Sequence, residues 1–389
     1  MTTHLPTETE LVLLLCRTPI AARATARVSA LLAHPVDWDA LFHRAAVWEL
    51  EAVVLSNLRC VFGEAIPPGV LEMVTDLERQ SRAHTLARTL VTVDLAAKFD
   101  AHGIDSLVLK GPAVGVAAYG DPSLRSFDDI DLLVRRKDLG RARDLLASIG
   151  YARQYEPSHE SFLIDQHHAL EFSNSRTRVE LHSALLERYL RLTIPENDLW
   201  SGALRIQCAG GTLGVLAQHH LFLFLCAHGA KHEWERPRWI RDIAQLVQRL
   251  DAATAARILD IAERTHARRL VALGLRLARD MFDADISLFP DSRLVPESDT
   301  RRLVNLVLGR AGLVEAAPSR GTSGILRHDP NIGPLIFWAA ARERNIDKIA
   351  CIARVLLVPT LSDEGPQAFR WASRPVRLAA RFFRRTARA

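Results

Sequence analysis

The feature that most constrains this chain is a short apolar segment with acidic residues at alternate positions, Asp129-Ile130-Asp131-Leu132-Leu133-Val134. We predict a strand over 130–134, and residues two apart on a strand share a face, so Asp129 and Asp131 project together. Carboxylates placed side by side repel each other, and a divalent cation offsets that repulsion. Mg²⁺ prefers hard oxygen ligands from one or two carboxylates combined with phosphates. The alternative is that Asp128 and Asp129 belong to a turn or cap the end of the strand.

A third acid follows on another predicted strand. Segments 169–173 and 178–182, separated by Asn174–Thr177, indicate an antiparallel hairpin. Glu180 lies in the second segment between apolar Val179 and Leu181, which makes it the best candidate for a neighbouring ligand. Three such acids can hold two metal ions, one that activates an attacking hydroxyl and one that holds a triphosphate.

Positively charged residues near these acids suit a phosphate. Lys110-Gly111 follows a predicted strand over 106–109, where glycine lets the backbone approach a phosphate and lysine neutralises its charge. The alternative is an ordinary turn with a surface lysine. Arg125 is either a phosphate contact or a surface ion-pair partner. Lys231 and His232 on a later predicted helix either line the cleft beside the sheet or form a polar helix face.

The order of predicted elements gives an α+β class. Helical spacing runs from Glu8 to about residue 102, with a helix start at Asp37-Trp38 and a long helix over 70–100. From residue 185 the pattern is helical again to the end. We therefore predict three domains: a helical N-terminal domain (1–102), an α+β core (103–184) and a helical C-terminal domain with a basic tail (185–389).

Composition narrows the class of protein. The chain is 48% hydrophobic and 24% charged, as in ordinary globular proteins. A net charge of +5 is compatible with a polyanionic ligand without indicating one. The five cysteines form no CxxC pair, which favours a reducing compartment. No apolar run approaches a membrane span, and the N-terminus lacks a signal-peptide pattern, so we expect a soluble cytoplasmic protein.

Two further features have ordinary explanations. His228 and His232 have zinc-ligand spacing on a predicted helix, but no HExxH motif is present and a metal role is disfavoured. The tail after Pro366 carries seven arginines and no acid. It is either a helix packed on the domain or a basic amphipathic helix with weak affinity for an anionic surface. Walker A and GxGxxG motifs are absent from the sequence, which argues against a P-loop kinase and a Rossmann enzyme.

The ordered set of motifs resembles the uncharacterised nucleotidyltransferase family of the DNA polymerase β-like superfamily, whose members occur among bacterial biosynthetic clusters, including some for ribosomal peptides. The resemblance covers most of the chain. It rests on these segments: Asp37-Trp38, Leu109-Lys110-Gly111, Tyr119-Gly120-Asp121, Arg125, Asp129–Val134, Gly150-Tyr151, Val179–His182, Ala227–His232, Trp239–Ala244, Val358-Pro359-Thr360 and Arg374–Leu378.

The resemblance implies a polymerase β-like core, a short mixed sheet with helices, flanked by helical regions. Asp129, Asp131 and Glu180 would be the catalytic metal ligands, for Mg²⁺ or Mn²⁺, with an NTP as donor. Lys110, Gly111, Arg125, Lys231 and His232 would contact the nucleotide or acceptor. Lys110-Gly111 departs from the superfamily's usual glycine-glycine or glycine-serine, and the gap to the acids is longer than usual.

We therefore expect a metal-dependent nucleotidyltransferase that transfers an NMP to a hydroxyl or phosphate of a small molecule or peptide. The sequence shows no dedicated nucleic-acid module. Two alternatives remain. One is a weak or inactive nucleotide-binding scaffold of a biosynthetic pathway, and the other is transfer from another nucleotide- or sugar-phosphate donor.

Overall fold

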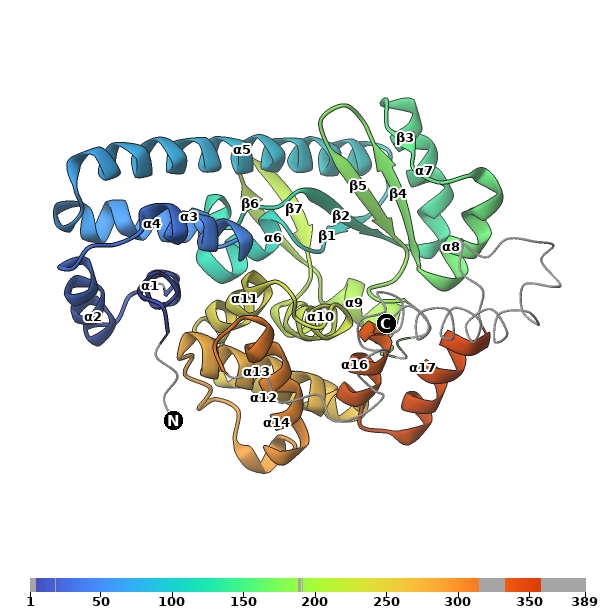
Figure 1. Cartoon of the computed structure of the whole chain (residues 1–389). Helices are drawn as coiled ribbons and strands as arrows, with labels where there is room; N and C mark the ends of the chain where they lie inside the picture. The colour runs from blue at the N-terminus through green and yellow to red at the C-terminus, as the bar shows by residue number, and fades with distance from the viewer. Residues whose placement is uncertain (1–4, 18, 188–189, 191, 315–332, 358–389) are drawn as a thin grey trace, which may run out of the picture.

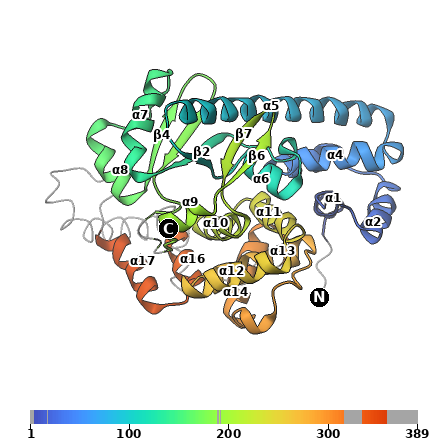
Figure 2. The same ribbon diagram turned by 180° about the vertical axis from the view of Figure 1, so that it is seen from behind.

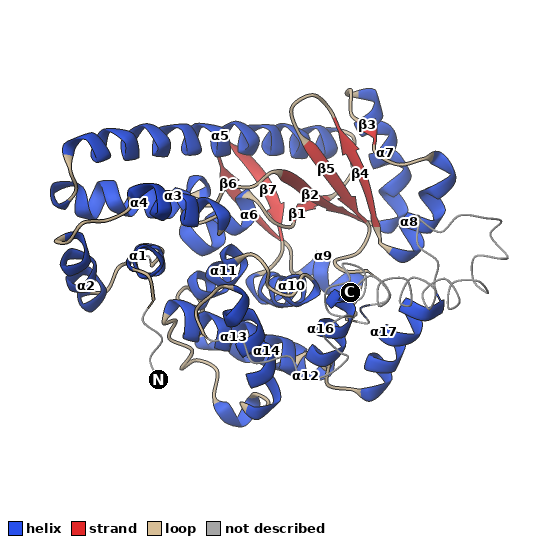
Figure 3. Cartoon of the chain, viewed as in Figure 1, coloured by secondary structure: helices blue, strands red, loops and turns tan. Residues whose placement is uncertain are grey.

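The structure is a computed structural model of the whole chain, and it describes residues 5–17, 19–187, 190, 192–314 and 333–357. A mixed sheet lies between a long helix and a layer of C-terminal helices (Figure 1). Figure 2 shows the same arrangement from behind, and Figure 3 separates helices from strands by colour. The predicted α+β class, a mixed sheet flanked by helical regions, is confirmed.

The sheet has seven strands in the order β3-β4-β5-β2-β1-β7-β6. β2 is antiparallel to β1 and parallel to β5, and β1 is parallel to β7. The hairpins β4–β5 and β6–β7 extend its two sides. The strands are β1 (Ser106–Val108), β2 (Asp129–Val134), β3 (Ala152–Arg153), β4 (Ala169–Ser173), β5 (Arg178–His182), β6 (Leu204–Cys208) and β7 (Gly211–Val215).

Alternation along β2 separates an apolar face from a functional one. Ile130, Leu132 and Val134 enter a core shared with β4, β5 and the helices α5 (Pro68–Ala101) and α7 (Leu139–Ser148). Asp129 and Asp131 therefore point to the opposite face, which α10 (Gln218–Lys231) and α11 (Pro237–Val247) cover. The apolar set fixes the register, because a slip of one residue would bury the acids in the apolar core.

Local signals explain where several helices begin and end. The side chain of Asp37 accepts a hydrogen bond of 2.9 Å from the Ala40 amide and caps the next helix. Pro68 begins α5, where a missing N–H costs nothing, and Gly103 follows its end with φ of 62°. The remaining helices of at least six residues are α1 (Thr7–Leu15), α2 (Ala22–Leu32), α3 (Trp38–Val47), α4 (Glu51–Phe62), α8 (Glu160–Gln166), α9 (Glu196–Ser201), α12 (Ala252–Arg264), α13 (Arg268–Phe282), α14 (Ser298–Arg310), α16 (Gly333–Ala341) and α17 (Asn345–Leu357); a short helix, α6 (Pro112–Val114), follows β1.

The structure confirms the predicted strands and corrects one helical prediction. Strands β1, β2, β4 and β5 and the long helix α5 lie where the sequence placed them. The expectation of helices from residue 185 onward is wrong for residues 204–215, which form the β6–β7 hairpin. Its turn is Ala209-Gly210, with φ of 47° and 79°, as two-residue hairpin turns require. The three-domain division stays a prediction, and the basic tail with Val358-Pro359-Thr360 lies outside the described residues.

Candidate active site

The strand pairing brings the predicted acids together. Asp131 on β2 lies directly opposite Glu180 on the parallel strand β5, so both side chains share one face of the sheet. Asp129 precedes Asp131 by two residues and lines the same cavity. Asp131 is 2% exposed, whereas Glu180 is partly exposed. Three residues that sequence analysis singled out as ligands thus lie at one site.

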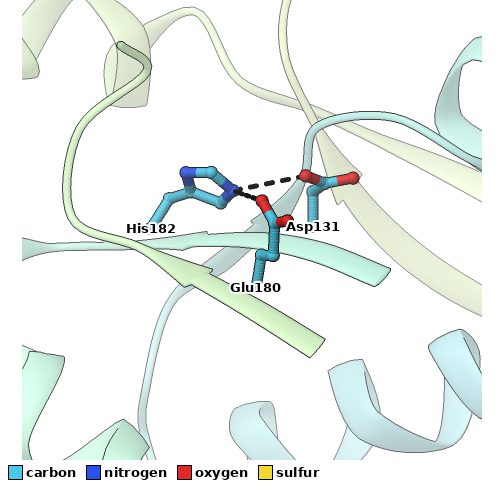
Figure 4. A group of neighbouring side chains, drawn as sticks. All are labelled: Asp131, Glu180 and His182. Atoms are coloured by element: carbon cyan, nitrogen blue, oxygen red, sulfur yellow. Dashed lines mark hydrogen bonds and ion pairs between the residues drawn. The ribbon is translucent and has the colours of Figure 1, made fainter. Parts of the chain in front are cut away.

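In Figure 4 the His182 ring nitrogen bridges Asp131 and Glu180, and Asp131 has a further contact with Lys110. Its Oδ1 lies 2.9 Å from Lys110 Nζ and 3.3 Å from His182 Nε2. The same His182 nitrogen lies 3.3 Å from Glu180 Oε2. The second oxygen, Asp131 Oδ2, is buried and has no hydrogen-bond partner within the described part of the chain. A buried oxygen left in this state requires an explanation, because its desolvation is uncompensated.

The electrostatics keep both carboxylates ionised. The hydrogen bond from His182 lowers the pKa of Glu180 to about 2. Burial alone would raise the pKa of Asp131, but the charge of Lys110 and the hydrogen bond from His182 outweigh burial and hold this pKa below its usual value. Burial also opposes the charged form of His182, yet its bonds to Asp131 and Glu180 raise its pKa to about 9. The site therefore presents ionised carboxylates, the form of these side chains that binds a metal ion.

The described residues contain one group of three or more His, Cys, Asp or Glu whose ligand atoms could hold a metal, namely Asp131, Glu180 and His182. Their ligand atoms lie within 4.8 Å of one another. His228 and His232 do not belong to it. Their rings, with centroids 4.8 Å apart, pack against each other and against Trp239.

The acids open into a cavity of about 520 Å³ between the sheet and α10–α11. Its lining includes every predicted site residue: Lys110, Gly111, Arg125, Asp129, Asp131, Glu180, Lys231 and His232. Further lining residues come from the β3–β4 side of the sheet and from α8: Gln154, Tyr155, Leu163, Glu171. A volume of this size suits a nucleotide-sized ligand.

In the Lys110-Gly111 turn, the backbone at Gly111 has a conformation that only glycine adopts readily. Gly111 has φ of 54° and ψ of −123°, and a Cβ at this position would lie 3.0 Å from the Phe127 ring. Gly111 also directly precedes Pro112, the first residue of α6. Lys110 is not a surface lysine, since its side chain is 15% exposed and pairs with Asp131.

The other predicted cations have protein partners. Arg125 is buried rather than a surface ion-pair partner, and its Nε donates to Asp242 Oδ2 at 2.9 Å. Lys231 forms an ion pair with Glu187. His232 has a pKa lowered to about 4, chiefly by burial, so it is neutral at pH 7. Lys231 and His232 do line the cleft between the sheet and the helical layer.

Sequence analysis missed two residues of the site. His182 contacts Asp131 and Glu180, and Glu171 lies directly opposite Glu180 in the β4–β5 register. The period of two within the predicted hairpin contained the signal for His182, because it follows Glu180 by two residues. The register, which sequence does not give directly, decides that Glu171 faces Glu180.

Comparison with known proteins decides the family. Residues 34–283 match the model of a family described as uncharacterised nucleotidyltransferase. The chain belongs to this family. The match contains every site residue described above, and it confirms the resemblance that the order of motifs indicated.

The family assignment rests on the family model alone. A crystal structure of an antigenic nucleotidyltransferase-like protein from Paracoccidioides brasiliensis is similar at 17% identity and a TM-score of 0.30. The similarity covers 50% of this chain and 96% of that chain. Among curated proteins none matches this nucleotidyltransferase family member. No helix in the described ranges is both long and apolar enough to span a bilayer.

Proposed function

We propose that this protein transfers a nucleoside monophosphate from an NTP to an oxygen of an acceptor, with pyrophosphate as the leaving group. The observation that carries the proposal is the buried, unpartnered Oδ2 of Asp131 at the centre of a carboxylate cluster in a nucleotide-sized cavity. Family membership supports the same reaction class.

The residues present fit a divalent cation. Asp131 and Glu180 belong to the group whose atoms could hold a metal, and Asp129 lines the same cavity. All three offer hard carboxylate oxygens, and the free Oδ2 of Asp131 supplies a ligand atom that nothing else in the described chain uses. We assign these three acids as the ligands of Mg²⁺ or Mn²⁺, and His182 as the group that orients Asp131 and Glu180. When bound, such ions supply positive charge to phosphate oxygens and lower the pKa of a nearby hydroxyl.

The chain's own groups would position the reaction. The acceptor oxygen attacks the α-phosphorus, the bond from that phosphorus to the α–β bridging oxygen breaks, and pyrophosphate leaves with the electron pair. Glu180 lies at the acceptor end and accepts the proton of the acceptor hydroxyl. Lys110 and the Gly111 backbone lie by the phosphates. Catalysis would come mainly from orientation and charge complementarity.

We place the acceptor among small molecules or peptides. The cavity has a volume of about 520 Å³, and its lining near β4 and α8 includes Ala169, Glu171 and Leu163. A nucleic-acid acceptor would require a basic track along the surface. The net charge of +5 over 389 residues does not indicate one.

A specific observation favours a second candidate, a protein that binds nucleotide without turnover. Lys110 Nζ lies 2.9 Å from Asp131 Oδ1, so one oxygen of a proposed metal ligand is already neutralised by the chain itself. A site in which Lys110 compensates the charge of Asp131 can bind the phosphates of a nucleotide through Lys110 without a metal ion. In that case nucleotide affinity would be independent of divalent cations.

The experiment that separates the two is calorimetric titration of ATP, GTP, CTP and UTP with and without Mg²⁺, beside a pyrophosphate-release assay on candidate acceptors. Transfer predicts that Mg²⁺ strengthens NTP binding and raises the melting temperature. It also predicts that Asp131→Asn shows a smaller rise. Equal shifts in both proteins would place the metal elsewhere and contradict the proposal.

A further inference from the structure

Two arginine side chains lie near each other at the wall of the cavity, close to the acids. Arg125 and Arg238 both line it, and their side chains are 2% and 11% exposed. Burial lowers the pKa of Arg238, and the like charge of Arg125 lowers it further. A buried guanidinium group with a like charge nearby is more stable when an anion lies beside it.

The protein partners of the two arginines do not satisfy every buried guanidinium nitrogen. Asp242 accepts from Arg125 and from the Tyr119 hydroxyl, at 2.9 and 2.6 Å, and both of its oxygens are thereby engaged. Arg238 donates from Nη1 to the Ser126 carbonyl, and its Nη2 lies 2.8 Å from Glu49 Oε2. Arg238 Nε is buried and has no hydrogen-bond partner in the ranges described.

Arg238 is held at the end of β2 where the proposed phosphate contacts lie. Ser126, whose carbonyl it binds, is three residues before Asp129. β1 is antiparallel to β2, so Lys110, which follows β1, also lies at the amino end of β2. Arg125 interacts electrostatically with Asp131 as well as with Asp242. Lys110, Arg125 and Arg238 therefore all lie near the amino end of β2, the strand that begins with Asp129 and contains Asp131.

We propose that Arg238 binds the β- and γ-phosphates of the donor, and hence the pyrophosphate leaving group. This inference rests on the proposed function and deepens it. A guanidinium can donate two parallel hydrogen bonds to phosphate oxygens, and the free Nε supplies a donor for this pairing. Because pyrophosphate contains neither base nor acceptor, its recognition here is independent of which NTP and which acceptor the protein uses.

The competing explanation is that Arg238 only ties α11 to the N-terminal helices. Glu49 lies between α3 and α4 and pairs with both Arg236 and Arg238. If this tie were the whole role, removing either partner would have the same consequence. Glu49→Gln breaks the ion pair while leaving Arg238 in place, which makes it the matched control for Arg238→Gln.

The test is calorimetric titration of inorganic pyrophosphate, with Mg²⁺ present, into the full-length wild type, Arg238→Gln, Arg238→Lys, Glu49→Gln and Asp131→Asn. Arg238→Gln should weaken pyrophosphate binding about ten- to a hundredfold, as expected for loss of a charge-assisted contact. Arg238→Lys keeps the charge without the planar fork and should fall between wild type and Arg238→Gln. Glu49→Gln should bind within about threefold of wild type. Melting temperatures of all variants report whether each one folds.

Two results would overturn the inference. One is wild-type pyrophosphate affinity in Arg238→Gln while Asp131→Asn has lost it, which leaves the proposed transfer intact and removes Arg238 from it. The other is an equal loss of pyrophosphate affinity in Glu49→Gln and Arg238→Gln. That result would mean that Arg238 only links α11 to the N-terminal helices through Glu49. If Arg238→Gln does not fold, Arg238→Lys against Glu49→Gln decides in the same way. Absence of both pyrophosphate and NTP binding in the wild type would instead refute the proposed function together with the inference.

Discussion

Two buried aspartates in this molecule differ in how their oxygens are used. Asp242 on α11 is fully buried, and its two oxygens accept from the Tyr119 hydroxyl and from Arg125 Nε. Asp131 on β2 is almost as buried, but only its Oδ1 has partners, Lys110 and His182. Its Oδ2 has none in the described chain.

The difference separates a structural carboxylate from one suited to a ligand. A buried carboxylate with hydrogen bonds to both oxygens holds its neighbours in place. Removing it leaves the charge of its buried partner uncompensated. A half-satisfied one that faces a cavity is stabilised further when a ligand arrives. Asp242 thus holds Arg125 in position, whereas Asp131 has the unused oxygen that a cation needs.

The largest expected effect is on stability, from Asp242→Asn. This change leaves the buried Arg125 charge without its counterion, which typically costs about 3–5 kcal/mol in the free energy of unfolding. Urea unfolding followed by circular dichroism measures it. Asp260→Asn removes an exposed partner of Arg293 and should cost less than about 1 kcal/mol. Similar free energies of unfolding for the two variants would show that Asp242 is not a structural carboxylate.

The converse change is Asp131→Asn. It keeps the side-chain volume and removes a proposed metal ligand, so pyrophosphate release should fall more than about a hundredfold while the protein still folds. Asp128, three residues earlier in the chain and with a side chain that is 72% exposed, provides the control. Asp128→Asn should retain activity within about threefold. Wild-type turnover in Asp131→Asn would exclude the metal site proposed here.

A smaller effect should come from Lys110→Ala, which removes the cation beside Asp131. Loss of one charge-assisted phosphate contact costs roughly 1.5–3 kcal/mol, so NTP affinity should fall about ten- to a hundredfold. Gly111→Val should damage both binding and local folding, because a side chain there meets Phe127 at positive φ. If Lys110→Ala binds NTP within about twofold of wild type, Lys110 does not contact the nucleotide.

The smallest effect concerns pH in metal-free protein. The pKa of His182 is raised to about 9 by its bonds to Asp131 and Glu180, above the usual 6.5. Because protonated His182 is favoured in the folded state, it stabilises the fold fully below pH 6.5, the usual pKa of histidine. This stabilisation is lost as the pH rises through about 9, the pKa in the folded state. The melting temperature of wild type in EDTA should therefore approach that of His182→Gln between pH 6.5 and 9. A constant difference across that range would contradict the assignment.

The sequence contained enough information to predict the acids but not their surroundings. Asp129, Asp131 and Glu180 follow from a period of two within apolar strands, which is a local pattern. The partnership of Arg125 with Asp242 joins residues 117 positions apart, and no local pattern encodes it. The β6–β7 hairpin was missed because its alternation is short and its strands are partly exposed.

The pairing of β1 has a consequence for synthesis on the ribosome. Its neighbour β2 ends at Val134, but its other neighbour, β7, is complete only at Val215. At typical elongation rates of about 5–20 residues per second, roughly 80 residues of translation separate the two events, or about 4–16 seconds. During that interval one edge of β1 has no strand to pair with. With only three residues, Ser106–Val108, β1 offers a nascent neighbouring chain few hydrogen-bonding groups, and its shortness protects the half-made sheet from association.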